Sequence, residues 1–210
     1  MKSKKQKRVK ITCYILLIVI SITMLFPFFW MVRSAFMTNR EITTVPIKWI
    51  PSRFSFDNFK EAFTKDSFGR YFLNSAVIVV VNMVGSILSS SFIAFGFSRL
   101  KFKGRNIWFV LMVVTMMLPG QVMMIPRFVL FNSMGWVGTY LPMIVPSFFA
   151  SGFNIFLIMQ FIRGIPRDMD EAAKIDGCSW YGVFFRIIVP MIVPSLVTVA
   201  VLTFMSSWED

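Results

Sequence analysis

The chain contains no histidine among its 210 residues and only two cysteines. The absence of histidine excludes imidazole acid–base catalysis, histidine metal ligation and every Ser–His or Cys–His nucleophile pair. Cys13 lies in an apolar run and Cys178 in a polar loop, so they supply neither a disulfide framework nor a zinc site. We therefore expect no metal site and no catalytic residues.

Charged residues are also scarce, at 15% of the chain, whereas 56% of the residues are hydrophobic. A soluble domain has about 25% charged residues, so a soluble globular enzyme is excluded, and the apolar content also excludes disorder. The formal net charge is +12. The basic residues lie mostly at the ends of apolar runs, without zinc-finger spacing or an RNA-binding motif, which indicates membrane lipid rather than nucleic acid as the partner.

Five apolar runs are long enough to be membrane-spanning helices. A helix needs about 20 mainly apolar residues to cross the hydrocarbon core, and continuous runs indicate helices rather than the alternating strands of a barrel. We predict an all-α, polytopic helical membrane protein. The runs are Ile11–Val32, Phe72–Phe97, Ile107–Ile125, Leu141–Ile162 and Met191–Met205.

The first run follows a basic N-terminus, residues 1–10, in which six residues are Lys or Arg. Cleavable signal peptides share this arrangement, but their apolar stretch is about 7–15 residues long. This run is longer and ends in bulky Phe26-Pro27-Phe28-Phe29-Trp30 rather than in the small residues of a cleavage site. We predict an uncleaved first span over residues 11–33.

Basic residues in the short loops predict the orientation. The loops 98–106 and 163–190 each carry four Lys or Arg residues, and they share one side with the N-terminus if the spans alternate. Dense Lys and Arg mark the cytoplasmic side. Segment 34–71 is longer and mixes acidic with basic residues, and the loop between the third and fourth runs has only Arg127. We predict a multi-pass cell-membrane protein with a cytoplasmic N-terminus, an extracytoplasmic segment 34–71 and a core over 72–210.

The loop 163–190 begins with the features of a short helix. Pro166 suits the first position of a helix because its missing N–H would be unpaired there anyway. Three carboxylates would then lie in the first turns, where the helix dipole favours them, and Glu171 could pair with Lys174 on the surface. The carboxylates are those of Asp168, Asp170 and Glu171.

Gly177 and Ser179 divide this loop into two helices. Gly177 tolerates the left-handed backbone that ends a helix, and Ser179 can cap a second helix from Trp180 to about Val189. Ala172 and Ala173 keep one face of the first helix small. Another protein could approach this face closely, or the loop could simply pack on its own spans.

The stretch Glu171-Ala172-Ala173, with Gly177 six residues after the glutamate and then Ile187 and Pro190, resembles the EAA motif of ATP-binding-cassette importer permeases. The run from Glu171 to Gly177 is especially similar to the carbohydrate branch, the maltose-type inner-membrane permeases. Cys178 stands where the family usually has Ala. The resemblance extends over most of the chain through Trp49-Ile50-Pro51, Phe56-Asp57-Asn58-Phe59, Leu118-Pro119, Ile125-Pro126 and the run from Gly135 to Tyr140.

This resemblance implies a type I importer permease fold with six spans, of which five are visible, so the chain is expected to stop before the last helix. It implies that the loop 163–190 docks in a groove of a separate ATPase subunit. The residues implied in that contact are Glu171, Ala172, Ala173, Asp176 and Gly177.

The resemblance also implies two further partners: a second homologous permease subunit and an extracytoplasmic solute-binding protein that delivers a sugar or oligosaccharide. The chain lacks a Gly-x-x-x-x-Gly-Lys-Ser/Thr phosphate loop. ATP is therefore expected on the partner subunit, and we expect this chain to hold no cofactor and to be no enzyme by itself.

Polar residues in the second and fourth runs are candidates for a substrate path. Asn82, Ser86 and Ser89 recur at the spacing of one helical face, and Asn154 lies in the fourth run. They could face the path and hydrogen-bond sugar hydroxyls, because polar groups facing lipid are costly. Alternatively, Gly85 and Ser89 could form a small-residue pair for close helix packing.

Other functions remain open at this point. A permease of the same class could carry glycerol phosphate or an amino acid, although the similarity of segment 34–71 to sugar permeases argues against amino acids. An intramembrane enzyme would need a buried acid pair, a Ser/Lys dyad or a metal set, and a channel would need a filter loop. The sequence shows none of these, and no Asp, Glu, Lys or Arg interrupts the second to fifth runs, which argues against proton or sodium coupling.

Overall fold

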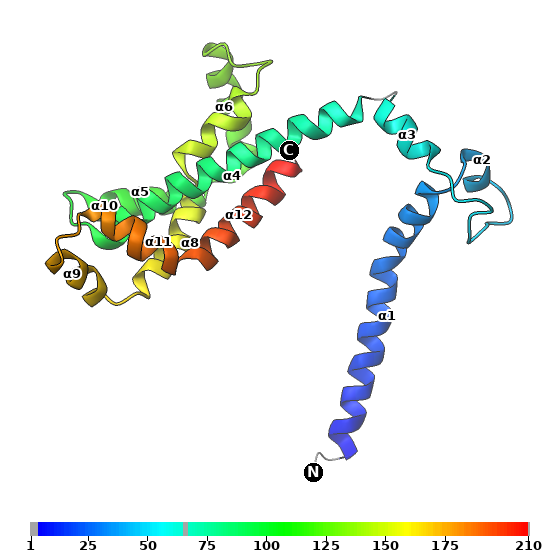
Figure 1. The fold of residues 1–210 in the computed structure, drawn as a ribbon, viewed down its shortest axis with the longest axis horizontal. Coiled ribbons are helices and arrows are strands. Elements are labelled where there is room, and N and C mark those ends of the chain that lie inside the picture. The colour runs from blue at the N-terminus through cyan, green and yellow to red at the C-terminus, as the bar shows by residue number, and fades with distance from the viewer. Residues whose placement is uncertain (1–3, 65–66, 210) are drawn as a thin grey trace. The chain divides into compact units, whose positions relative to one another are not determined.

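The computed structural model describes residues 4–64 and 67–209, and every regular element within them is a helix (Figure 1). The predicted all-α class is confirmed. The first three residues of the predicted basic N-terminus lie outside the described residues. The chain forms two compact units, Met1–Tyr71 and Phe72–Asp210.

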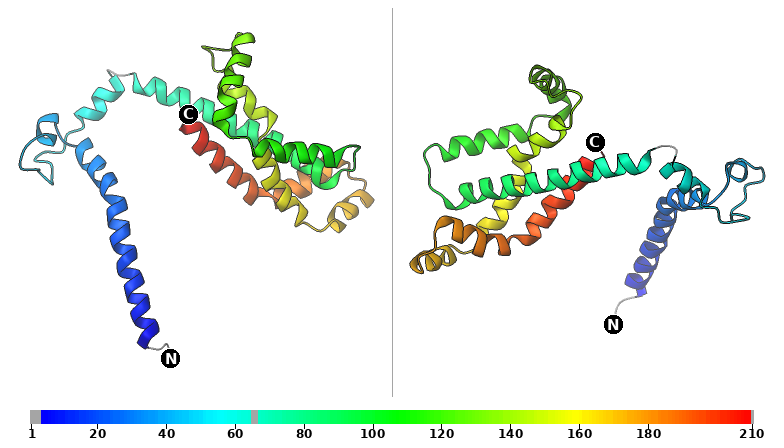
Figure 2. Two further views of the ribbon diagram at one scale, coloured as in Figure 1. Left: turned by 180° about the vertical axis from the view of Figure 1, so that it is seen from behind. Right: turned by 45° about the horizontal axis from the view of Figure 1, so that its top comes forward.

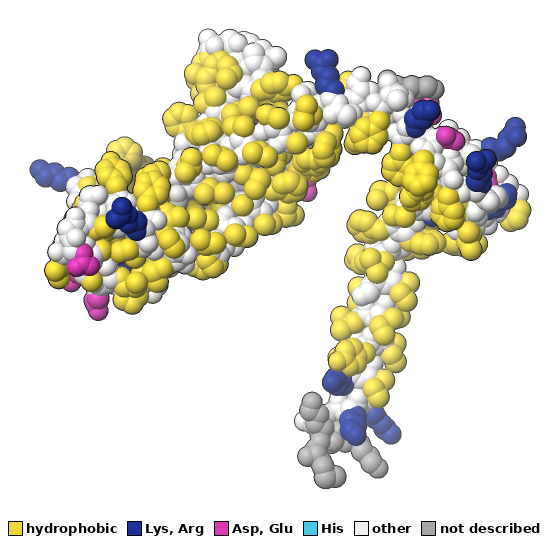
Figure 3. Space-filling model, in the orientation of Figure 1, with side chains coloured by type: hydrophobic (Ala, Val, Ile, Leu, Met, Phe, Trp, Pro, Cys, Tyr) yellow, Lys and Arg dark blue, Asp and Glu magenta, His cyan; other side chains and the backbone are white. Residues whose placement is uncertain are grey.

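The first unit begins with α1 (Lys4–Ala35), a 32-residue helix whose apolar side chains are exposed on all faces. Within its own unit, none of its most apolar window is buried. Figure 3 shows hydrophobic side chains along its visible face. A helix that is apolar all round and uncovered suits lipid, not water.

The rest of the first unit, with α2 (Asn39–Ile42) and α3 (Asp57–Thr64), is held by an aromatic cluster and by side-chain caps. The Phe36 ring lies 5.4 Å from that of Phe56 and 5.5 Å from that of Phe59, measured between centroids. Asn58 donates from Nδ2 to the carbonyls of Ala35 (3.0 Å) and Met37 (2.8 Å). These contacts order a segment that has little regular structure.

The second unit is built around α4 (Phe68–Arg99), which enters it at Phe72. The C-terminal end of α12 (Val193–Trp208) approaches α4 at an angle (Figure 2), and the rings of Phe72 and Trp208 are 5.6 Å apart. The other elements are α5 (Arg105–Met116), α6 (Gly120–Ser133), α7 (Leu141–Ile144), η1 (Val145–Phe149), α8 (Gly152–Arg163), α9 (Asp168–Ile175), α10 (Trp180–Val183), η2 (Phe184–Ile188), α11 (Val189–Met191) and α12 (Val193–Trp208).

The core of this unit forms where α8 packs against α5 and α12. Ile158 and Ile162 of α8 are fully buried, as are Ile188 of η2 and Val199 of α12. Their side chains, with Ala94 of α4, belong to one apolar cluster. This cluster fixes the positions of the helices that carry the polar residues described below.

Three described stretches are long and apolar enough to cross a membrane: Gln6–Ala35, Phe68–Arg99 and Leu141–Arg163. Two bent helix pairs raise the number to as many as five if each pair is one span. The predicted span over Ile107–Ile125 is not one straight helix, because α5 and α6 meet at 103°. Pro119 lacks a backbone donor and disfavours helical geometry at the residue before it, so the helix breaks there.

The fourth run is also interrupted, at Ala150, where φ is +60°. Immediately after this break, Gly152 comes close to α5. A Cβ atom at Gly152 would lie 2.9 Å from Cγ of Met116 and 3.1 Å from the carbonyl oxygen of Met112. The fifth run follows a helical stretch, Trp180–Met191, from which α12 is bent by 76°.

Candidate functional site

The loop after α8 folds as α9 followed by the helical stretch Trp180–Met191. The prediction that Pro166 occupies the first helical position is wrong. The carbonyl of Arg167 accepts the first helical hydrogen bonds, from the backbone N–H groups of Asp170 (2.9 Å) and Glu171 (3.1 Å). Arg167 is therefore the cap, α9 begins at Asp168, and Pro166 precedes both.

The predicted end of α9 is confirmed. Gly177 has a φ of +79°, which costs glycine little. Its N–H donates to the carbonyl of Lys174 (3.0 Å), and the N–H of Cys178 donates to that of Ala173 (2.9 Å). These two bonds form a Schellman motif. The predicted cap of the next helix is confirmed as well, because Oγ of Ser179 accepts from a backbone N–H at 3.2 Å.

The five residues expected to contact an ATPase differ in exposure. Glu171, Ala172, Asp176 and Gly177 are exposed, whereas Ala173 is buried in the apolar cluster beneath α9. Ala173 therefore supports the helix from inside the unit.

Lys174 does not form the predicted ion pair with Glu171 among the described residues. Its Nζ lies over the ring of Trp180, 3.3 Å from the centroid. This cation–π contact links α9 to the first turn of α10.

Two apolar side chains of this loop stand out that sequence reasoning missed. Ile175 at the end of α9 is 86% exposed, and Tyr181 is 74% exposed. The available signal was an isoleucine next to Asp176 in an otherwise polar turn. No other large apolar side chain of the described loop residues 163–190 is as exposed as these two.

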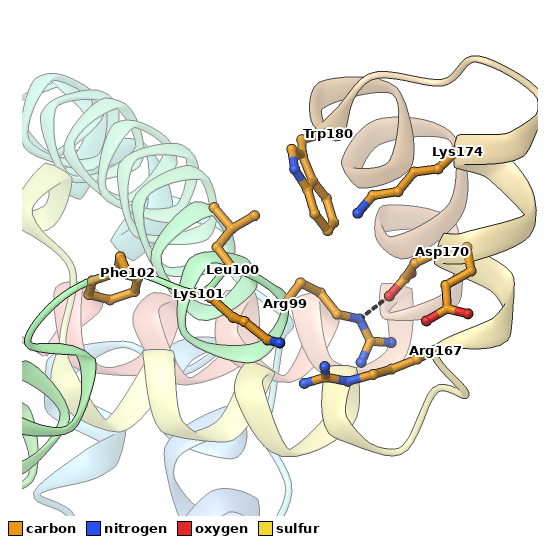
Figure 4. A pocket seen from close by; sticks show the side chains of 9 residues that line it. Arg99, Leu100, Lys101, Phe102, Arg167, Asp170, Lys174 and Trp180 are labelled. Carbon is orange, nitrogen blue, oxygen red and sulfur yellow. Dashed lines mark ion pairs between the residues drawn. The ribbon is translucent and has the colours of Figure 1, made fainter.

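A buried ion pair joins α9 to the end of α4 (Figure 4). Nε of Arg99 lies 2.6 Å from Oδ2 of Asp170, and the two side chains are only 3% and 6% exposed. The sequence predicts Arg99 in the loop 98–106, but it is the last residue of α4. Burial raises the pKa of the Asp170 carboxyl above its ordinary value, and the charge of Arg99 opposes that rise.

The polar residues predicted for the path come together in part. Asn82, Ser86 and Asn154 line one cavity of about 840 Å³. Asn154 donates from Nδ2 to Oγ of Ser86 (2.9 Å), and Asn82 donates from Nδ2 to Oγ of Ser207 (3.1 Å). All three predicted side chains are largely buried in a bundle whose outer surface is apolar.

Ser89 is placed differently. It is not among the residues that line the cavity. Its Oγ lies 2.7 Å from the carbonyl oxygen of Gly85 and 3.2 Å from that of Ser147 in η1. Ser89 and Gly85 thus form a close packing contact with η1, which was the alternative interpretation of these small residues.

The cavity also contains residues that sequence reasoning did not select. Thr203, Ser206 and Ser207 come from α12, at the same helical spacing that identified the α4 residues. Arg127 is the one charged side chain among the described residues that line the cavity. The prediction that Arg127 lies in a loop is wrong, because α6 continues through it to Ser133.

Residues 86–210 match the family described as the binding-protein-dependent transport system inner membrane component. The chain is 35% identical over 188 residues to the arabinooligosaccharides transport system permease protein AraQ of Halalkalibacterium halodurans. The aligned region covers 88% of this chain and 67% of that protein. It is 34% identical to the probable ABC transporter permease protein YurM of Bacillus subtilis, over 94% of this chain and 65% of that one.

The fold matches a solved structure throughout. A chain of a bacterial ABC transporter involved in the import of the acidic polysaccharide alginate superposes with a TM-score of 0.90 at 21% identity, covering all of this chain and 74% of that one. The present chain thus spans about two thirds to three quarters of the proteins that it matches. It belongs to the family of inner-membrane components of binding-protein-dependent transport systems.

Proposed function

We propose that this chain is a permease subunit of an ATP-driven importer and forms part of the path for a sugar or oligosaccharide delivered by an external binding protein. The observation that carries the proposal is the cavity whose lining includes several amide and hydroxyl side chains within an apolar bundle. Such groups both donate and accept hydrogen bonds, as sugar hydroxyls require. The names of relatives such as the arabinooligosaccharide permease support a saccharide as the solute.

In this proposal, Asn82, Ser86 and Asn154 contact the solute, and Ser89 serves helix packing. We predict that Ser86→Ala raises the KM for uptake about 2- to 13-fold, the effect of losing one net hydrogen bond of about 0.5–1.5 kcal/mol. Ser89→Ala is the matched control on the same helix, and it should leave KM unchanged. Initial uptake rates of radiolabelled saccharide in proteoliposomes measure both. Equal KM values for the two variants would contradict this path.

We further propose that α9 and the turn after it dock on a separate ATP-binding subunit, on the cytoplasmic side that the basic loops indicate. Glu171, Ala172, Asp176 and Gly177 would form the contact, with Ala173 supporting them from beneath. ATP would be bound by that subunit, and this chain would hold no cofactor. A second homologous permease subunit would complete the path.

The docking proposal predicts different results for two glycines with similar positive φ angles. Gly177 and Gly138 have φ values of +79° and +84°, and a Cβ atom would meet nothing within 4 Å at either. Gly177→Asp should reduce recovery of the co-expressed ATPase on a tagged permease at least 10-fold, because it adds bulk and charge to the contact. Gly138→Asp should leave recovery unchanged. Equal recovery for both variants would show that the turn at Gly177 is not the contact.

Growth tests then address the solute. A strain lacking this gene should lose growth on one or more saccharides as the sole carbon source and regain it from a plasmid copy. Loss of growth on glycerol phosphate with normal growth on saccharides would instead favour the other permease class.

A further inference from the structure

We propose that the ion pair between Arg99 and Asp170 is the link through which movement of α9 reaches α4 and the polar cavity. This inference rests on the proposed docking of the ATPase on α9. It assigns to both residues a positioning role in transport, without contact to the solute.

The first argument is the geometry at the junction (Figure 4). The Arg99 side chain bridges two parts of the loop, because its Nη2 also donates to the carbonyl of Ile165 at 2.8 Å. A second contact runs from the loop to α4: Nη2 of Arg167 lies 3.4 Å from the carbonyl oxygen of Ser98. The end of α4 and the start of α9 are therefore tied in both directions by charged side chains.

The second argument is how little else holds α9 from inside. Asp170 and Ala173 are its only buried residues. The alanine offers one methyl group, whereas the ion pair brings two charged groups to within 2.6 Å of each other. Pulling the two charges apart would leave each buried without its partner, which is strongly unfavourable. A contact that resists separation can transmit a pull.

The third argument is the continuity of α4. It runs without a break or a proline from the cavity to Arg99. Ser86 lies 13 residues before Arg99, about 20 Å along the helix at about 1.5 Å per residue. By contrast, the route from α9 to α12 passes through the π-helical turn η2 and the 76° bend. A displacement at Arg99 is thus carried along a rigid element to Ser86, which contacts Asn154 of α8 and Thr203 of α12.

The test uses the assembled transporter, with its ATPase and companion permease, in proteoliposomes. Arg99→Met combined with Asp170→Leu replaces the pair by apolar side chains of similar size, a change that buried ion pairs often tolerate. We expect ATPase recovery within 2-fold of the unmodified protein, uptake reduced at least 10-fold, and ATP hydrolysis no longer stimulated by solute-loaded binding protein. Lys101→Met is the control, since Lys101 lines the same cavity as the pair and should not affect uptake.

Normal uptake by the double variant would overturn the proposal, because the ion pair would then serve packing alone and not transmission. Loss of ATPase recovery would overturn it too, since the pair would then serve docking rather than transmission. The proposed docking of the ATPase is tested separately. If it is wrong, Gly177→Asp will leave recovery of the ATPase unchanged.

A second variant remains informative if the apolar pair does not fold. Arg99→Cys and Asp170→Cys are introduced together after Cys13 and Cys178 are replaced by serine, and the two thiols are bridged by a reducible bifunctional methanethiosulfonate. We expect low uptake with free thiols, at least a 5-fold gain on bridging, and loss of that gain on reduction. Confirmed bridging without a gain in uptake would overturn the proposal.

Discussion

Gly85→Leu is expected to leave little folded permease in the membrane, whereas Gly96→Leu on the same helix should be tolerated. A Cβ atom at Gly85 would lie 2.7 Å from Oγ of Ser147 and 2.9 Å from the ring of Phe148, both in η1. A Cβ atom at Gly96 would meet nothing within 4 Å. Overpacking of this kind costs about 1–3 kcal/mol or more, and leucine adds three carbons beyond the Cβ atom.

The measurement is the thermal midpoint and the monodisperse fraction of each detergent-solubilised variant. Gly96→Leu is the control, because both substitutions replace a glycine inside the same helix. Any difference between their midpoints therefore comes from the contact with η1. A midpoint for Gly85→Leu equal to that for Gly96→Leu would show that η1 does not pack against α4 as described.

Ile175→Asp is expected to reduce ATPase recovery at least 30-fold while leaving the permease fold intact. The side chain is 86% exposed, so its replacement costs the isolated chain little. An apolar anchor at the centre of an interface contributes about 2–4 kcal/mol, which corresponds to about 30-fold or more in affinity. A buried, unpaired carboxylate in the contact would weaken it further.

Ile175→Leu preserves the apolar surface and should retain recovery within 3-fold. Titration of the purified permease with the ATPase subunit measures the affinity directly. Wild-type affinity for Ile175→Asp would place the contact on another face of the loop, even if the fold and the Gly177 result stand.

The features predicted correctly from the sequence are those that depend on neighbouring residues. The cap by Ser179 and the stop at Gly177 are set by hydrogen bonds within a few positions, so the local sequence was sufficient. The break at Pro119 was missed although proline itself is a local signal, because the apolar residues on both sides formed one continuous run. At Ala150 the positive φ angle has no local signal.

The pairing of Arg99 with Asp170 depends on residues 71 positions apart, and no local pattern specifies it. Charge alone suggested that Arg99 belonged to a loop, whereas a buried partner allows it to end a helix. Similarly, Asn82 and Ser86 could be assigned to one face of α4, but their partners on α12 emerged only from the fold.

The partners of the α4 side chains also define an order of events during synthesis. Ser207, which accepts from Asn82, follows it by 125 residues, and Thr203 follows Ser86 by 117. At about 5–20 residues per second, about 6–25 s elapse between the translation of Asn82 and that of its acceptor. During this interval the nascent helix carries an amide without its final partner, a costly group in hydrocarbon. Asn82 of α4 can therefore reach its final partner only after α12 has been made.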